Sequence, residues 1–264
     1  MWRRLREEAE AAIALEPTMT NLLIGAVLNR GSFAEAVARR VSTRLGAPAL
    51  PAQLVADAFS VALAAEPRIA WAFQADLTAV VDRDPACRRL IEPFLYFKGF
   101  HALCAHRLAH WLWRADRVDF ALYLQSRSSE VFQTDIHPAA PFGAGVFLDH
   151  ATGLVVGETA VVEDDVSILQ NVTLGGSGKE AGDRHPKIRR GVLIGAGSKI
   201  LGNIEIGACT RIAAGSVVLR DTPGNVTVAG VPAKVIGPAG CAEPARNMEQ
   251  LLSDLAYNGF NYII

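Results

Sequence analysis

Apolar residues recur at every sixth position through the second half of the chain. A strand alternates with a period of two and a helix has a period of about 3.6, so neither repeats every six residues. A hexapeptide repeat does, because each hexad forms a short strand and a turn, and three hexads close a triangular coil. The pattern predicts a left-handed parallel β-helix. Its aliphatic positions are Val156, Val162, Ile168 and Leu174, followed by Ile188, Ile194, Ile200, Ile206, Ile212 and Val218.

The period breaks twice. Leu174 and Ile188 are fourteen residues apart, two more than two hexads, and the segment 175–187 contains four glycines, five charged residues and one histidine. We expect a loop that leaves the solenoid there, and surface loops often carry function. A second break of two residues falls near Leu154. It leaves open whether the His150 side chain points inward or outward.

The chain is expected to be an α+β protein in three parts. Residues 1–134 form an all-helical domain that caps the first coil, since an open solenoid end must be covered. Residues 135–237 form the β-helix with its extruded loop 175–187, and residues 238–264 form a C-terminal tail. The tail ends in an apolar stretch, which predicts docking on its own subunit or on a partner.

Two helix signals stand out within residues 1–134. Asp84 before Pro85 predicts the start of a helix, with the aspartate as its cap. The segment after Pro93 predicts the most apolar helix of the domain, of the kind found in cores and subunit interfaces. The residues along its stripe are Tyr96, Phe100, Leu103, Arg107 and Trp111.

Composition narrows the class of protein. The 26 basic and 27 acidic residues nearly balance, so nothing favours nucleic acid or a membrane as a partner. The charged N-terminus is not typical of a signal peptide, and no apolar run reaches the roughly 20 residues of a membrane helix. The four cysteines lack zinc or redox spacing. We therefore expect a soluble, cytoplasmic protein with reduced thiols.

Titratable residues interrupt the aliphatic repeat in the segments 135–138, 148–153 and 183–186. A histidine that acts as a general base needs a fixed tautomer, which a carboxylate can provide. Asp135 and His150 are fifteen residues apart, fewer than the ~18 of one coil, so they can lie on nearby corners. A lone histidine most often has a structural role, but clusters with aspartates favour chemistry.

These segments resemble the active-site motifs of the serine O-acetyltransferases, a family of the hexapeptide-repeat acyltransferase superfamily. The matching motifs are Phe132–Ala140, Leu148–Gly153 and Gly182–Ile188, and the helical segments Asp82–Ala86 and Leu95–Leu103 are similar to the family's N-terminal domain. The resemblance implies transfer of acetyl from acetyl-CoA to the hydroxyl of L-serine. The products are O-acetyl-L-serine and CoA, in cysteine biosynthesis.

The resemblance also implies the chemistry of the site. His150 would take the proton from the serine hydroxyl as it attacks the thioester, with Asp135 orienting the ring. The protonated histidine would return that proton to the CoA thiolate, so the transfer is direct. No cysteine lies in the matching motifs, which argues against an acyl-enzyme.

For L-serine, the resemblance implies that Asp84 and Asp149 bind the ammonium group. Arg184 suits the carboxylate, because its fork binds two oxygens at once. His185 would complete this catalytic pocket from a neighbouring subunit, since a solenoid without an internal cavity buries ligands between subunits. The resemblance also implies a homotrimer or a dimer of trimers, which is a hexamer.

For CoA, the family pattern implies a groove along Gly176, Ala196 and Ala214, with Lys234 near a phosphate. A basic run either steers the same anion or forms a solvated charged face, and it comprises Arg184, Lys187, Arg189 and Arg190. Acetyl-CoA is expected as a co-substrate, with no permanently bound cofactor and no metal. L-cysteine is the expected feedback inhibitor, and Ile264 is expected to engage O-acetylserine sulfhydrylase.

Two alternatives stay open at this point. A related hexapeptide acyltransferase would use another hydroxyl acceptor, such as homoserine. A zinc lyase of the γ-carbonic-anhydrase kind would use His137, His150 and His185 as ligands on the same solenoid. The ligand spacing of that metal enzyme is absent from the chain.

Overall fold

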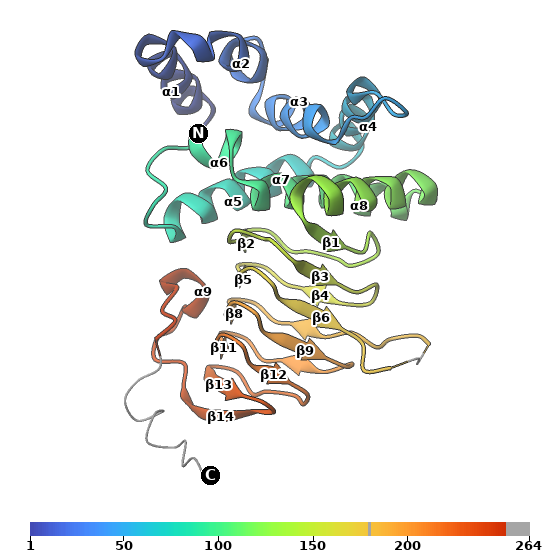
Figure 1. Ribbon diagram of the computed structural model, residues 1–264, viewed down its shortest axis with the longest axis vertical. Helices are drawn as coiled ribbons and strands as arrows, with labels where there is room; N and C mark the ends of the chain where they lie inside the picture. Colours follow the sequence, from blue (N-terminus) through green and yellow to red (C-terminus); the bar gives the residue numbers. More distant parts are fainter. Residues whose placement is uncertain (179–180, 252–264) are drawn as a thin grey trace. The chain divides into compact units, whose positions relative to one another are not determined.

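A computed structural model describes residues 1–178 and 181–251. The chain separates into two compact units, Met1–Phe132 and a second unit that begins at Gln133. The first is helical and the second is built of short strands (Figure 1). No helix in the described ranges is long and apolar enough to cross a membrane.

The helical unit is organised around α7, which packs against α3, α4, α5, α6 and α8. Most of α7 is buried, because apolar residues occupy nearly every face of it. The elements of the unit are α1 (Trp2–Leu15), a 3-10 turn (Pro17–Met19), α2 (Thr20–Leu23), a π-helical turn (Ile24–Leu28), α3 (Phe33–Leu45), α4 (Ala52–Ala65), α5 (Arg68–Arg83), α6 (Ile91–Leu95), α7 (Lys98–Arg114) and α8 (Val118–Phe132).

The prediction of one continuous apolar helix after Pro93 is wrong. It consists of the end of α6 and the whole of α7, with Tyr96 half exposed at the break. The Arg40 guanidinium from α3 donates to the carbonyl of Leu95 at 2.5 Å. This bond satisfies a carbonyl at the end of α6 and so stabilises the break.

The prediction that a helix starts at Pro85, capped by Asp84, is also wrong. α5 ends at Arg83, and the next helix begins only at Ile91. Asp84 closes α5 through its backbone N–H, which donates to the carbonyl of Val80 at 2.9 Å. Its carboxylate accepts from the N–H of Ala86 at 2.8 Å, an Asx turn in place of a helix cap.

Three sheets form the walls of the second unit, and all their pairings are parallel except the last. The first wall contains β1 (Thr134–Ile136), β3 (Leu154–Val156), β6 (Thr173–Gly175), β9 (Lys199–Leu201) and β12 (Val217–Val218). The second contains β4 (Val161–Val162), β7 (Lys187–Ile188) and β10 (Glu205–Ile206). The third contains β2 (Phe147–Leu148), β5 (Ser167–Ile168), β8 (Leu193–Ile194), β11 (Arg211–Ile212), β13 (Val226–Gly230) and β14 (Ala233–Pro238), with β14 antiparallel to β13.

Strand register explains both breaks in the six-residue period. Where the period is intact, a residue pairs with the one 18 positions later, as Val156 does with Leu174. The offset is 20 for Leu148 and Ile168, and 26 for Ile168 and Ile194. The breaks are therefore insertions of two and eight residues. Both leave the aliphatic stack in register.

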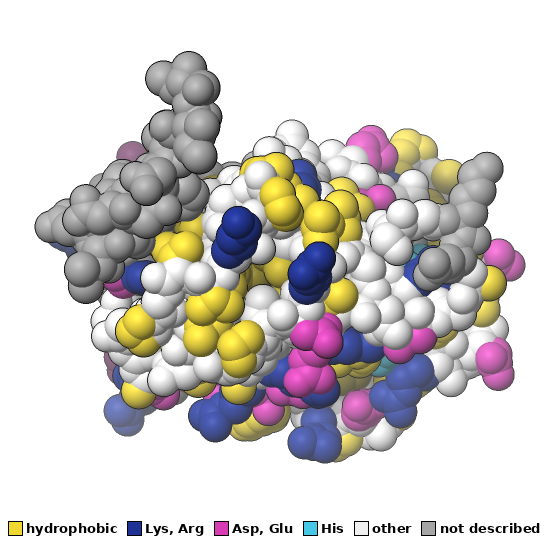
Figure 2. Space-filling view, turned by 90° about the horizontal axis from the view of Figure 1, so that it is seen from below, with side chains coloured by type: hydrophobic (Ala, Val, Ile, Leu, Met, Phe, Trp, Pro, Cys, Tyr) yellow, Lys and Arg dark blue, Asp and Glu magenta, His cyan; other side chains and the backbone are white. Residues whose placement is uncertain are grey.

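The C-terminal end of the coil is closed by the β13–β14 hairpin, and apolar side chains lie exposed on it beside separate Lys and Arg side chains (Figure 2). The described part of the tail docks on its own β-helix. α9 (Pro244–Asn247) packs against β8, and the Ser167 hydroxyl donates to the carbonyl of Ala245 at 2.7 Å. The buried Arg211 side chain donates to the carbonyls of Glu249 and Leu251.

Candidate active site

The predicted site residues of the β-helix lie mainly on two corners of the coil. The turns that join the third wall to the first form the His150 corner. The turns that join the first wall to the second, together with the loop before β7, form the His185 corner. The two corners lie at opposite ends of β3.

His150 points outward, which settles the direction that the sequence leaves open. The two-residue insertion lies between β2 and β3, and within it His150 and Ala151 both have positive φ, 53° and 59°. Such angles are unfavourable for residues with a Cβ. The His150 side chain is 74% exposed, and its Nε2 lies 3.8 Å from the Asp149 carboxylate. The backbone strain thus accompanies an imidazole that is accessible to a ligand.

Asp135 lies in the middle of β1, directly beside Val155 of β3. The N–H of Gly153 donates to the carbonyl of Gln133 at 2.8 Å, which joins the His150 turn to the residues before Asp135. The chain segments that carry Asp135 and His150 are therefore neighbours in one unit. The orienting role of the carboxylate stays a prediction.

Ala196 and Ala214 lie on the same corner as His150, in later coils. The N–H of Gly215 donates to the carbonyl of Ala196 at 2.8 Å, so these two turns are stacked. The stacking is close, because a Cβ on Gly195 would lie 2.6 Å from the backbone nitrogen of Ala214. Lys234 lies in the terminal strand β14, beside Ala229. Ala196 and Ala214 therefore form a small-residue ridge on the later coils of this corner. The turn between that ridge and His150 carries Gln170 and Asn171.

The His185 corner holds its imidazole against backbone. The His185 side chain is buried, and a Cβ on Gly157 would overlap its Nε2 and Cδ2 atoms. A Cβ on Gly176 would lie 3.7 Å from the same Nε2. Gly176 therefore belongs to this corner and not to the ridge of Ala196 and Ala214. The two glycines leave room for the ring.

Charged groups surround His185. Arg184 donates to the Glu158 carboxylate at 2.8 Å and to the carbonyl of Gly182 at 3.0 Å. A guanidinium has five N–H donors, so others remain for a substrate carboxylate. Burial lowers the pKa of His185, and the nearby Arg184 and Lys187 charges lower it further. The hydrogen bond from Arg184 lowers the pKa of Glu158. This corner favours a neutral imidazole.

The sequence did not point to Glu158 and Thr159, which hold Arg184 and His185. They follow the corner glycine of the hexad Val156-Gly157, where polar residues are common on the solenoid surface. Only the 26-residue register across the loop places them beside residues 184 and 185. A register drawn from the aliphatic positions on both sides of the loop was the available signal.

The basic run has carboxylate partners. Arg184 pairs with Glu158, Lys187 with Asp183, Arg189 with Glu163 and Glu205, and Arg190 with Asp165. Arg189 and Arg190 follow β7 and lie on the remaining corner, away from the two that carry the site. For these two residues, the structure favours a solvated charged face over a steering surface.

Two predicted positions lie elsewhere. Asp84 belongs to the helical unit, at the end of α5. Ile264 lies outside the described residues. Within residues 1–178 and 181–251, no three His, Cys, Asp or Glu side chains gather as metal ligands would.

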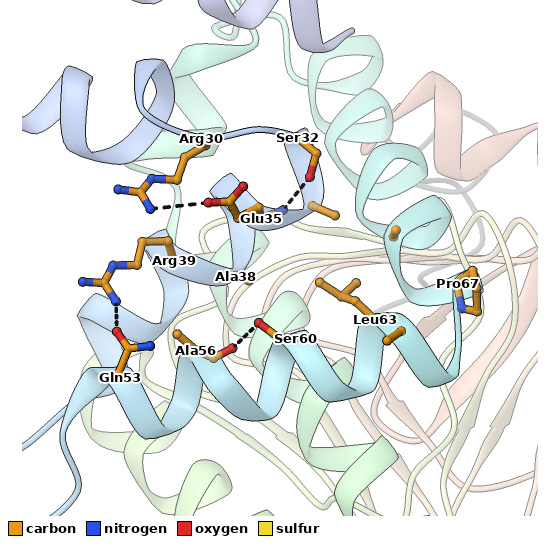
Figure 3. A pocket seen from close by; sticks show the side chains of 13 residues that line it. Arg30, Ser32, Glu35, Ala38, Arg39, Gln53, Ala56, Ser60, Leu63 and Pro67 are labelled. Carbon is orange, nitrogen blue, oxygen red and sulfur yellow. Dashed lines mark hydrogen bonds and ion pairs between the residues drawn. The ribbon is translucent and has the colours of Figure 1, made fainter.

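A hollow of about 580 Å³ lies in the helical unit (Figure 3). It is lined mainly by α3 and α4 and contains none of the predicted site residues. Arg30 pairs with Glu35 at 3.4 Å, and Arg39 donates to Gln53 at 2.8 Å (Figure 3). These contacts already engage its cations, and we assign it no ligand.

Comparison with known proteins places the chain in a family. Family models match it over residues 1–105 (serine acetyltransferase, N-terminal) and 185–220 (bacterial transferase hexapeptide, six repeats). Serine acetyltransferase of Salmonella typhimurium is 47% identical over 262 residues, 99% of this chain and 96% of that protein.

Solved structures agree. Serine acetyltransferase from Brucella abortus strain S19 in complex with coenzyme A is 60% identical, with a TM-score of 0.90 over 92% of this chain and 97% of that chain. A serine acetyltransferase in complex with cysteine is 46% identical, with a TM-score of 0.93 over 96% of this chain and 98% of that chain.

A helical N-terminal unit followed by a hexapeptide coil, with an exposed histidine at one corner, defines a hexapeptide-repeat acyltransferase. Within that class, the chain belongs to the serine acetyltransferase family. The predicted α+β fold class with a left-handed β-helix is confirmed. So is the predicted enzyme class, an acetyl-CoA-dependent O-acetyltransferase. The homoserine and zinc-lyase alternatives gain no support from these relatives.

Proposed function

We propose that the protein transfers the acetyl group of acetyl-CoA to the hydroxyl of L-serine, in the way the family resemblance implies. The observation that carries the mechanism is the outward imidazole of His150, which the insertion before β3 places on the same corner as Ala196 and Ala214. A general base must reach its substrate, and an imidazole 74% exposed at a corner can do so.

The chemistry needs one proton to move twice. His150 accepts the proton of the serine hydroxyl as its oxygen attacks the thioester carbonyl, and Asp135 steadies the resulting imidazolium. The C–S bond then breaks, and the imidazolium gives its proton to the departing thiolate. The products are O-acetyl-L-serine and CoA, and the enzyme returns to its starting state.

The substrates would lie along the two corners. Asp84 and Asp149 bind the serine ammonium group, while Arg184 and His185 bind its carboxylate. The pantetheine arm of CoA runs down the ridge, where Ala196 and Ala214 allow contact with backbone. Gly176 borders the arm from the other corner, and Lys234 meets a phosphate. Acetyl-CoA is a co-substrate, and no cofactor is held between turnovers.

A cyclic homotrimer completes this site. His150 and His185 lie at opposite ends of β3 within one chain, so one chain alone does not offer both to a small ligand. A three-fold axis that sets the His150 corner of one subunit against the His185 corner of the next forms three equal sites. The helical units then pair two trimers into a hexamer.

Three further proposals rest on the family resemblance. L-cysteine inhibits by binding where L-serine binds, in line with the related serine acetyltransferase in complex with cysteine. Ile264 engages O-acetylserine sulfhydrylase, and the enzyme acts in the cytoplasm. No nucleic acid or membrane partner is proposed.

The test is thiol release from acetyl-CoA with L-serine, L-homoserine and water as acceptors. We expect release with L-serine, and His150→Ala to lower kcat about 10²–10⁴-fold, the usual contribution of a general base. Because the side chain is exposed, the melting temperature should stay within a few degrees of wild type. Thiol release with L-homoserine but not L-serine would overturn the acceptor, and full activity of His150→Ala would overturn the base.

A further inference from the structure

Thr159 holds the base of the loop that carries Arg184 and His185. Its hydroxyl oxygen accepts from the backbone N–H groups of Arg184 at 3.0 Å and His185 at 3.1 Å. Its carbonyl accepts from the Lys187 ammonium at 2.7 Å, and the same ammonium donates to the carbonyl of His185 at 2.9 Å. Thr159 thus contacts Arg184, His185 and Lys187 at the base of the loop.

The same residue determines which ring nitrogen of His185 carries the proton. The backbone N–H of Thr159 donates to Nδ1 at 3.2 Å. The Thr159 hydroxyl lies 2.8 Å from Nδ1, and since its oxygen already accepts two bonds, its own proton is directed at that nitrogen. Two donors facing Nδ1 leave that nitrogen without a proton. The neutral ring therefore carries its proton on Nε2.

The Asp183 carboxylate also faces the Thr159 hydroxyl, but Lys187 binds that carboxylate at 2.5 Å. The backbone N–H of Thr159 is a second donor to Nδ1, at 3.2 Å against 2.8 Å for the hydroxyl, so the hydroxyl makes the shorter contact. Nε2 is directed away from Thr159, over Gly157 and near Gly176. An N–H there matches a carboxylate oxygen, whereas the other tautomer would present a lone pair and repel it.

We infer that Thr159 is a positioning residue, whose hydroxyl and backbone N–H lock His185 in the neutral Nε2–H tautomer so that it meets the substrate carboxylate as a hydrogen-bond donor. The inference rests on the proposed function, because L-serine supplies that carboxylate. The charged groups that face the His185 ring are Arg184 and Lys187, which oppose its protonation, and Glu158 and Asp183, which favour it.

The experiment compares Thr159→Val, which keeps the shape and removes the hydroxyl, with Thr159→Ser, which keeps the hydroxyl. We expect Thr159→Val to raise the KM for L-serine about tenfold or more, the effect of losing hydrogen bonds that align a charged site. Thr159→Ser should stay within about twofold of wild type, and the KM for acetyl-CoA should change little in both. Equal KM values for L-serine in Thr159→Val and wild type would overturn the inference.

The pH dependence separates positioning from a general loss of structure. The ratio of wild-type to Thr159→Val kcat/KM should be largest above pH 7 and smaller at acid pH, where protonation puts a proton on both ring nitrogens. A ratio that does not change with pH contradicts the tautomer lock.

The tautomer can also be measured without the catalysed reaction, by ¹⁵N NMR of protein with labelled histidines. The His185 signals are assigned as those that are lost in His185→Asn. We expect Nε2 to be protonated and Nδ1 unprotonated in wild type and in Thr159→Ser. A proton on Nδ1 in wild type overturns the inference even if the Thr159→Val chain fails to fold. Wild-type protein with this tautomer but no acetyl transfer to L-serine refutes the proposed function instead.

Discussion

At the scale of single residues, the site depends on where side chains are absent as much as on where they are present. Gly157 has no positive φ that would demand glycine, yet the His185 ring occupies the space its Cβ would fill. Thr159 holds that ring from the other side through Nδ1. The ring therefore has little freedom to move away from an added methyl group.

Gly157→Ala should displace the His185 ring without strain in the backbone. We expect kcat/KM for L-serine to fall at least about tenfold, with the loss in KM, because an approach this close forces a side chain to shift. The melting temperature should change by only a few degrees. Gly237→Ala is the matched control in the same unit, since a Cβ there meets no atom within 4 Å. A Gly157→Ala enzyme with unchanged KM would mean that the ring position is not critical.

At the scale of elements, α6 and α7 are joined by a buried histidine. His101 of α7 lies 2.8 Å from the carbonyl of Phe94 in α6, so its Nε2 donates there. Its Nδ1 is buried without a hydrogen-bond partner in the described ranges. Burial lowers the pKa of His101 to about 3, and the nearby Arg40 and Arg44 charges act in the same direction. The folded unit therefore holds this ring neutral.

This lowered pKa predicts acid sensitivity of the helical unit. The unfolded chain binds a proton at the ordinary histidine pKa of about 6.5, whereas the folded chain does not until about pH 3. The stabilisation is complete above about pH 6.5 and is lost progressively as the pH falls, by about 3 kcal/mol at pH 4. The four tryptophans, Trp2, Trp71, Trp111 and Trp113, all lie in this unit, so their fluorescence in urea reports its unfolding.

The control is His101→Gln, whose amide nitrogen can replace Nε2 but does not titrate. It should lower stability at neutral pH and flatten the pH dependence between pH 4 and 6.5. An equal slope in wild type and His101→Gln would assign the acid sensitivity to other groups.

The elements also show which parts of the fold can be predicted from the sequence. The aliphatic six-residue period predicts the coils as far as Val218, because one inward side chain per hexad is set by local geometry. The last coil departs from the period, since Ile212 pairs with Val228 at an offset of 16. The period also locates both insertions. A two-residue insertion does not show which of its side chains point inward, so the outward direction of His150 is known only from the structure, where the residue has a positive φ. The helix start at Pro85 and the unbroken helix after Pro93 fail because distant contacts, such as Arg40 with Leu95, override a local pattern.

At the scale of the whole molecule, the proposed trimer divides one site between two chains. His150 comes from one subunit, and Arg184 and His185 come from the next. An arrangement of this kind has a consequence that no single-chain site shares: two inactive variants can repair each other. His150→Ala lacks the base but keeps an intact His185 corner, whereas Arg184→Ala lacks the carboxylate clamp but keeps an intact His150 corner.

Coexpression of His150→Ala and Arg184→Ala in equal amounts should therefore restore activity. Random assembly places an intact His150 corner against an intact His185 corner at about one quarter of the interfaces, so about one quarter of wild-type kcat is expected. Coexpression of His150→Ala with Asp135→Ala is the control, because Asp135 serves His150 of its own chain and no assembly reunites them. If the first mixture is no more active than its parents, the site lies within one chain. His150 would then act with residues of its own chain and not with the loop of a neighbouring subunit.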